Sequence, residues 1–271
     1  MTVALDAGTR RLAAGPLHFA RFAYPPNALG YCGPDDPAAL IGHTSAGESG
    51  PDLVALARQF AGAWPYLELI AASSGRADPL DEAVVEAYWI GNRLLHRVQP
   101  RVFAAHLAGR FEARAGRGFV DLATLALLGA VPHHNFHVFG VYPWVGLLRA
   151  GPALGGSAVA EPLRVLNSCR IRWGRVQSIH NGLAEVAGRA LEWDGRALRL
   201  GPTRVEAVVC ATADGSLAPT VNPGDVVAVH WDWACDVLSP VRLDALRSFT
   251  LRILRMTNEA LRRPVAAAVL D

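Results

Sequence analysis

Cys169-Arg-Ile-Arg-Trp-Gly-Arg-Val176 and Gly224-Asp-Val-Val-Ala-Val-His-Trp-Asp-Trp-Ala234 mark the two ends of the stretch that decides the fold. Between them, Asn181-Gly182 and Asp194-Gly195 are residue pairs that two-residue hairpin turns prefer. Apolar runs on either side of these turns alternate with polar residues, as strands of a half-buried sheet do. Five or so short strands joined by tight turns predict a small closed barrel.

A final helix is predicted directly after the barrel, because Ser239-Pro240 is typical of a helix start. Arg262-Arg263-Pro264 should end it, since proline cannot continue a helix. Apolar residues recur between these limits at spacings of three and four, which places them on one face of the helix: Leu243, Leu246, Phe249, Ile253 and Met256.

The first part of the chain has the period of helices. The clearest one is expected from Asp78 to Val98, where Asp78 can cap the first turn and Pro79 can occupy its first position. Two more are expected at about residues 102–113 and 119–128. Glycines and a proline within residues 151–163 are typical of a linker. We therefore expect an α+β protein, with a mainly helical domain at residues 1–160 and the barrel with its C-terminal helix at residues 161–271.

Composition excludes several classes of protein. The chain has 271 residues, of which 51% are hydrophobic, so it can bury a core. All 26 basic residues are Arg, they are scattered among acidic residues, and the net charge of +2 argues against a nucleic-acid partner. No stretch of the sequence reaches the roughly 18 consecutive apolar residues that a membrane span needs, and residues 1–21 do not resemble a signal peptide. Four widely spaced cysteines predict free thiols in a reducing compartment, and we expect the protein to be cytoplasmic.

Cys169 and His230 combine one soft and one borderline metal ligand at the two ends of the barrel stretch. Arg170 and Arg172 follow Cys169 closely. They are expected to lower the pKa of its thiol and to favour an anionic group bound beside it. Cys210 and Cys235 lie in apolar runs and are interpreted as packing residues.

The two stretches quoted at the outset resemble the HypC/HupF family of small chaperones that assemble [NiFe]-hydrogenases. The resemblance implies a five-stranded OB-like barrel with a C-terminal helix. The first keeps the family's Cys, Gly, basic residue and Val at Cys169, Gly174, Arg175 and Val176, and the second keeps its Gly-Asp, Val-His, aromatic residue and Ala. The resemblance covers residues 168–262. Cys169 departs from the family's pattern because it lies inside a longer chain, and the residues before it resemble only an uncharacterised actinobacterial domain.

The resemblance implies that Cys169 is an iron thiolate and that His230 is a second ligand or an orienting group. The implied cargo is iron carrying cyanide and carbon monoxide, Fe(CN)2CO, with Arg170 and Arg172 close to it. The implied partners are a HypD-like maturation protein and the precursor of the hydrogenase large subunit. On this hypothesis the protein is a scaffold or metallochaperone and not a catalyst.

A second metal site is suggested by His133, His134 and His137, together with Cys32. Prolines flank the histidines, so we expect an extended segment in which His133 and His137 share a face. Cys32 belongs to the stretch Tyr24 to Asp36, which is rich in Pro and Gly and is expected to form an ordered loop. The alternative functions are therefore a metal-dependent enzyme that uses these residues with the barrel as support, or a metal-free protein-interaction module.

Overall fold

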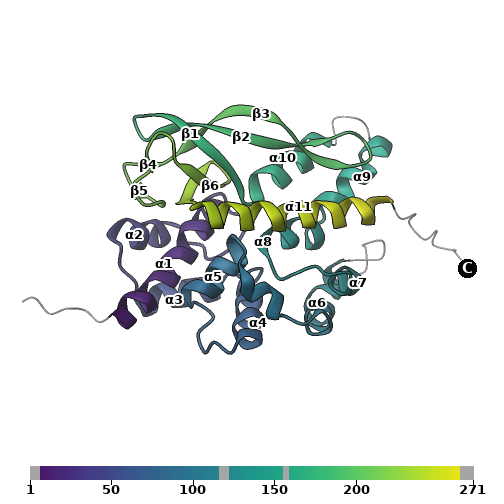
Figure 1. Ribbon diagram of the computed structural model, residues 1–271, viewed down its shortest axis with the longest axis horizontal. Helices are drawn as coiled ribbons and strands as arrows, with labels where there is room; N and C mark the ends of the chain where they lie inside the picture. Colours follow the sequence, from purple (N-terminus) through teal and green to yellow (C-terminus); the bar gives the residue numbers. More distant parts are fainter. Residues whose placement is uncertain (1–6, 116–121, 155–158, 263–271) are drawn as a thin grey trace, which may run out of the picture.

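Helices make up the first part of the chain, as predicted (Figure 1). The computed structural model describes residues 7–115, 122–154 and 159–262. The helices and helical turns before the barrel are α1 (Ala7–Ala28), α2 (Ala38–Ala46), α3 (Pro51–Arg58), α4 (Trp64–Ser74), α5 (Glu82–Trp89), η1 (Arg93–Arg97), α6 (Pro100–Ala115), α7 (Leu122–Leu127), α8 (His134–Phe136), η2 (His137–Val141), α9 (Trp144–Leu154) and α10 (Ala160–Cys169).

Five strands then close a barrel in the order β1-β2-β3-β7-β6. They are β1 (Arg172–His180), β2 (Leu183–Trp193), β3 (Leu198–Val209), β6 (Val226–His230) and β7 (Trp233–Val237). Neighbouring strands pair antiparallel except at β3 and β7, which meet in parallel at one pair, Val209 and Trp233. The two short strands β4 (Ala211–Thr212) and β5 (Gly215–Ser216) pair with each other beside the barrel. The predicted α+β class is thus confirmed.

Both predicted turns lie where the sequence placed them, although the second, at residues 194–197 between β2 and β3, has four residues and not two. Asn181 and Gly182 have φ angles of 50° and 79° and join β1 to β2, as an Asn-Gly hairpin turn requires. A third hairpin joins β6 to β7 directly after His230. Its first residue, Trp231, has a φ of 51°, which is rare for a bulky residue and must be held by the surrounding structure.

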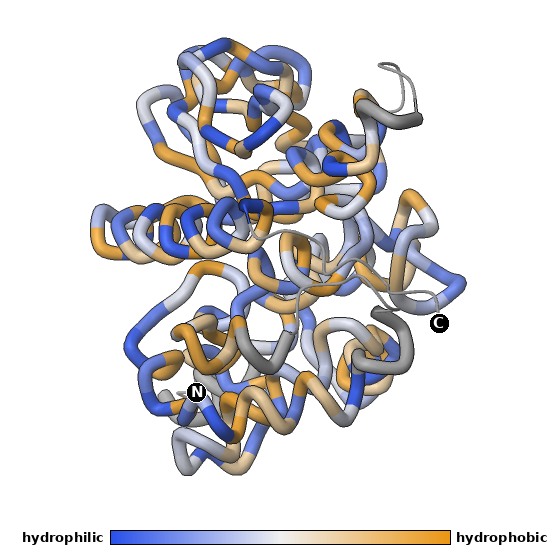
Figure 2. Tube along the Cα trace, turned by 90° about the vertical axis from the view of Figure 1, so that its right-hand side faces the viewer, coloured by the Kyte–Doolittle hydropathy of each residue, from blue (hydrophilic) through white to orange (hydrophobic). Residues whose placement is uncertain are grey.

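The last helix, α11 (Pro240–Arg262), runs beneath the barrel in Figure 1, with α9 and α10 on its barrel side and most of the other helices on its opposite side. Figure 2 likewise shows the barrel at the top of the molecule with the helical part beneath it. The main cluster of buried apolar residues runs from α1 to α11 and includes barrel residues such as Ile171 and Ala228. A smaller cluster around Val186 and Val208 fills the barrel itself. Within the described residues, no helix combines enough length with enough apolar character to cross a bilayer.

Some sequence predictions were wrong in detail. Helix α1 continues to Ala28 through Pro25 and Pro26, where a loop was expected. The helix predicted from Asp78 to Val98 is divided into α5 and η1, because Gly91 between them adopts a φ of 94° that breaks the helical path. Residues 102–113 lie within α6, and α7 covers 122–127 of the helix expected at 119–128.

Helices occupy both ends of the stretch at residues 151–163, where a linker was predicted. Helix α9 continues to Leu154, and α10 begins at Ala160. Residues 155–158, like residues 119–121 of the predicted helix before α7, lie outside the described part of the chain.

Candidate metal centre

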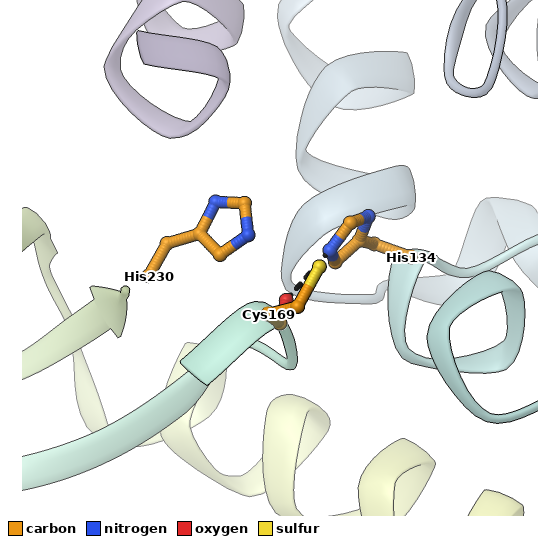
Figure 3. A group of neighbouring side chains, drawn as sticks. All are labelled: His134, Cys169 and His230. Atoms are coloured by element: carbon orange, nitrogen blue, oxygen red, sulfur yellow. Dashed lines mark hydrogen bonds between the residues drawn. The ribbon is translucent and has the colours of Figure 1, made fainter. Parts of the chain in front are cut away.

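Three side chains that can ligate a metal converge between the helices and the barrel (Figure 3). His134 lies on α8, Cys169 is the last residue of α10, and His230 is the last residue of β6. One ligand atom from each lies within 4.8 Å of the others, and all three residues are buried. In the described residues, this is the one group of three or more His, Cys, Asp or Glu side chains gathered closely enough to hold an ion.

His230 is oriented by a backbone carbonyl that a proline leaves free. Its Nδ1 lies 2.6 Å from the carbonyl oxygen of Phe22 in α1. Four residues further along this helix stands Pro26, which has no N–H to donate to that carbonyl. Because a carbonyl only accepts, Nδ1 of His230 must carry the proton, and its Nε2 must hold a lone pair. Nε2 is buried and has no hydrogen-bond donor among the described residues, so its lone pair could be offered to a metal ion.

His134 is held in a similar way. Its Nε2 lies 2.8 Å from the carbonyl oxygen of Cys169, so this nitrogen donates. Its Nδ1 then accepts from the hydroxyl group of Tyr88, at 3.2 Å. Each imidazole of the group therefore gives one N–H to a backbone carbonyl and keeps one lone pair. In His134 this lone pair accepts a hydrogen bond from Tyr88. In His230 no hydrogen-bond donor among the described residues reaches it.

Neighbouring residues tie the three ligands to one another. The side chain of Asn135, next to His134, accepts from the amide of Ile171 at 2.7 Å and donates to its carbonyl at 3.2 Å. The amide of Trp231, next to His230, donates to the carbonyl of Ser168 at 2.7 Å. These buried bonds lie within two residues of every ligand, so the positions of His134, Cys169 and His230 depend on one another.

Burial sets the protonation states of the group. It lowers the pKa of His230 to about 3 and that of His134 well below its usual value, so both imidazoles are neutral near pH 7. Burial also raises the pKa of the Cys169 thiol, Cys32 adds to this rise, and the indole of Trp231 opposes it. A metal ion would therefore have to displace the thiol proton when it binds.

The expectation that arginines lower the pKa of Cys169 was wrong, because burial outweighs any such effect. Arg172 is instead engaged by Glu206 of β3, with 2.9 Å between Nε and Oε1. The guanidinium of Arg170 donates to the carbonyl of Arg189 at 2.6 Å. Neither arginine lines the cavity described below, so neither is placed to contact a ligand bound there.

A cavity of about 170 Å³ adjoins the three ligands. Aromatic side chains form most of its wall, and Cys32 and His137 line it as well. No Asp or Glu is among its lining residues in the described part of the chain. The cavity thus has metal ligands and apolar walls but no carboxylate that could serve as a general base.

The histidines 133, 134 and 137 do not form a metal site of their own. His134 and His137 lie in consecutive helical turns, not in the extended segment expected from the flanking prolines, and His133 precedes them as the cap of α8. His133 caps α8, since its Nδ1 accepts from the amide of Asn135 at 3.0 Å, and its ring stacks on Phe249. The Nδ1 of His137 lies 3.1 Å from the hydroxyl group of Tyr66. Only His134 joins Cys169 and His230.

Sequence reasoning found all three ligands but assigned them to two competing sites. The contribution of the Phe22 carbonyl was missed altogether. One signal was present, because Pro25-Pro26 follows Phe22 closely, and a proline within a helix frees the carbonyl four residues before it.

A family model described as a family of unknown function, DUF6390, matches residues 11–264, so the chain belongs to this family. No curated protein and no solved structure matches the chain significantly. The function must therefore be argued from the site itself.

Proposed function

We propose that this member of the DUF6390 family is a metal-binding accessory protein that holds an iron centre between His134, Cys169 and His230 during hydrogenase assembly. The observation that carries the proposal is the convergence of three buried ligand atoms within 4.8 Å of one another. The free Nε2 of His230 supports it, because an unsatisfied buried nitrogen is costly unless something else binds it.

The donor set limits the metal. One thiolate and two imidazoles suit iron, zinc, copper or nickel, whereas calcium and magnesium prefer oxygen ligands. Iron is chosen among these because of the resemblance of residues 168–262 to the HypC/HupF family, in which the residues matching Cys169 and His230 serve an iron centre.

Charge and space favour a metal that brings its own ligands. A dication bound by one thiolate keeps a charge of +1, which an apolar cavity without a carboxylate would not stabilise. One cyanide ligand would neutralise this charge, and the second cyanide of Fe(CN)2CO would leave the centre with a charge of −1. The cavity of about 170 Å³ has room for roughly five groups of the size of water, at about 30 Å³ each, which is enough for iron with three diatomic ligands.

The residues that line the cavity favour a metal carrier over a hydrolytic enzyme. Many hydrolytic metal enzymes use a carboxylate as the base that activates water, and no carboxylate lines this site. On the proposal, the partners are those that the resemblance implies: a HypD-like protein that builds the iron centre, and the precursor of the hydrogenase large subunit that receives it.

The test is infrared spectroscopy with iron analysis on protein purified anaerobically from its own host. We expect cyanide and carbonyl stretching bands, together with iron, in the wild type and in the Cys210→Ser control, whose thiol belongs to the barrel cluster. Both signals should vanish in Cys169→Ala and weaken in His230→Ala. Iron-free wild-type protein without these bands would refute the carrier proposal.

A metal-dependent enzyme is the second candidate, favoured by the free space beside the ligands and by the phenols of Tyr88 and Tyr142 in the cavity wall. Burial raises the pKa of both phenols and keeps them protonated. The Tyr88 hydroxyl already donates to His134, so Tyr142 would be the hydrogen-bond donor to a bound substrate. A stoichiometric metal ion without cyanide or carbonyl bands in the infrared experiment would favour this candidate.

A further inference from the structure

We propose that Cys32 is the fourth ligand of this metal centre and supplies its second thiolate when a bare divalent ion is bound. The inference rests on the proposed metal site and adds to it the residue that completes the coordination shell. It also gives a role to the loop between α1 and α2, which otherwise only covers the cavity.

Cys32 lines the same cavity as the three ligands. The Cys32 sulfur does not belong to the group of atoms within 4.8 Å, so it stands at the edge of the site and must approach by a movement of its side chain and loop.

The backbone of the loop is fixed at Cys32 itself. The side chain of Asn27 donates to the carbonyls of Cys32 and Pro34 at 2.8 and 2.6 Å. Gly30 and Gly33 flank Cys32 with φ angles of 74° and 93°, a region that only glycine adopts freely. Rotation of the Cys32 side chain, with a small adjustment of the loop, would move the thiol while Asn27 keeps the backbone over the cavity.

Tyr31 places the loop against the ligand-bearing hairpin. Its ring packs on Trp231 with 4.4 Å between the ring centroids, and its hydroxyl group accepts from Arg164 at 3.3 Å. Trp231 follows His230 directly. The residue before Cys32 is therefore in contact with the residue after a proposed ligand, which brings the Cys32 backbone to the mouth of the site.

A closed metal site in a protein needs a fourth ligand, which Cys32 would provide. Zinc and similar ions take four ligands in a closed protein site, and the three found here leave one position open. The free, fully buried Nε2 of His230 points to a ligand independently of Cys32. A second thiolate would bring a dication to neutrality in a cavity that offers no other anionic side chain. Exogenous anions such as cyanide would compete with Cys32 for this position.

The experiment is an anaerobic titration of the full-length metal-free protein with Co2+, because the sulfur-to-cobalt charge-transfer absorption grows with the number of bound thiolates. Cys32→Ser should have about half the absorption of the wild type and should bind Co2+ at least 10-fold more weakly. The Cys210→Ser control should match the wild type, because its thiol does not line the cavity. X-ray absorption of the zinc-loaded proteins gives an independent count, for which we expect two sulfur ligands in the wild type and one in Cys32→Ser.

Equal absorption and equal affinity of Cys32→Ser and the wild type would overturn the inference while leaving the site of His134, Cys169 and His230 intact. Loss of the fourth ligand in His137→Phe instead of Cys32→Ser would also overturn it, since His137 lines the same cavity. A wild type that binds neither Co2+ nor Zn2+ would refute the proposed metal site itself. Unfolding curves of the metal-free variants show whether any loss of binding comes from misfolding.

Discussion

Replacing Pro26 by alanine should weaken metal binding without weakening the fold. An alanine at this position would supply the N–H that the carbonyl of Phe22 lacks, and this N–H would compete with Nδ1 of His230 for the same oxygen. Groups that orient a metal-bound histidine typically contribute 10- to 100-fold to metal affinity. We therefore expect Pro26→Ala to raise the Kd for Zn2+ by this factor, or about 1.4–2.7 kcal/mol.

The stability of the metal-free protein should change in the opposite direction. Removing a proline from a helix stabilises the helix by up to about 3 kcal/mol. Urea unfolding of Pro26→Ala should thus show equal or higher stability, while competition with a chelator shows weaker binding. Pro25→Ala is the matched control, because the carbonyl four residues before it belongs to Arg21 and holds no ligand of the site. Unchanged affinity in Pro26→Ala, or equal weakening in Pro25→Ala, would refute the reasoning.

Two further predictions concern the fold. Burial holds the pKa of His137 and His230 at about 3, so below about pH 6.5 the unfolded chain binds protons that the fold excludes. The free energy of unfolding of the metal-free protein should therefore fall by at least about 3 kcal/mol between pH 6.5 and 5, which urea unfolding at both pH values checks. Gly91→Ala should cost about 2–4 kcal/mol, because its Cβ would overlap the Phe249 ring at a left-handed position, whereas Gly47→Ala meets nothing and should cost about 1 kcal/mol. Equal losses in the two variants, by the same assay, would contradict this account of Gly91.

The barrel and the last helix were predictable because their signals are local. An Asn-Gly pair favours one turn geometry whatever surrounds it, and the apolar spacing of residues 243–256 identifies one face of a helix. These elements follow from a few consecutive residues. The structure places β1, β2 and α11 where those residues indicated.

Helix α1 and the histidine segment were not predictable in this way. Pro25 and Pro26 disfavour a helix locally, yet the helix continues because the buried Phe19 and Phe22 pack it against Trp89 of α5. Residues 134–141 are helical although prolines flank the segment. The side chain of Asn135 bonds to Ile171 and Thr250, far away in the sequence. Such contacts decide the local conformation, and no short window of sequence contains them.

The candidate site was predictable as a set of ligand types but not as one constellation. Cys169 and His230 were paired through a resemblance, whereas His134 was assigned to its neighbours in sequence. Only the fold reveals that Asn135 joins Ile171 and that Trp231 joins Ser168, which brings the three ligands together.

This division of the site between the two parts of the chain gives the helical part a role in metal binding. The barrel side contributes Cys169 and His230, but the carbonyl that orients His230 and the third ligand, His134, both come from the helical part. The cavity walls of α1, α5 and the loop around Cys32 also exclude water from the thiol, which raises its pKa. A barrel without these helices would expose Cys169 and leave His230 without its partner. The helical part would therefore turn a common barrel with one thiol and one imidazole into a closed site, and binding and release of a metal would depend on how firmly the two parts pack together.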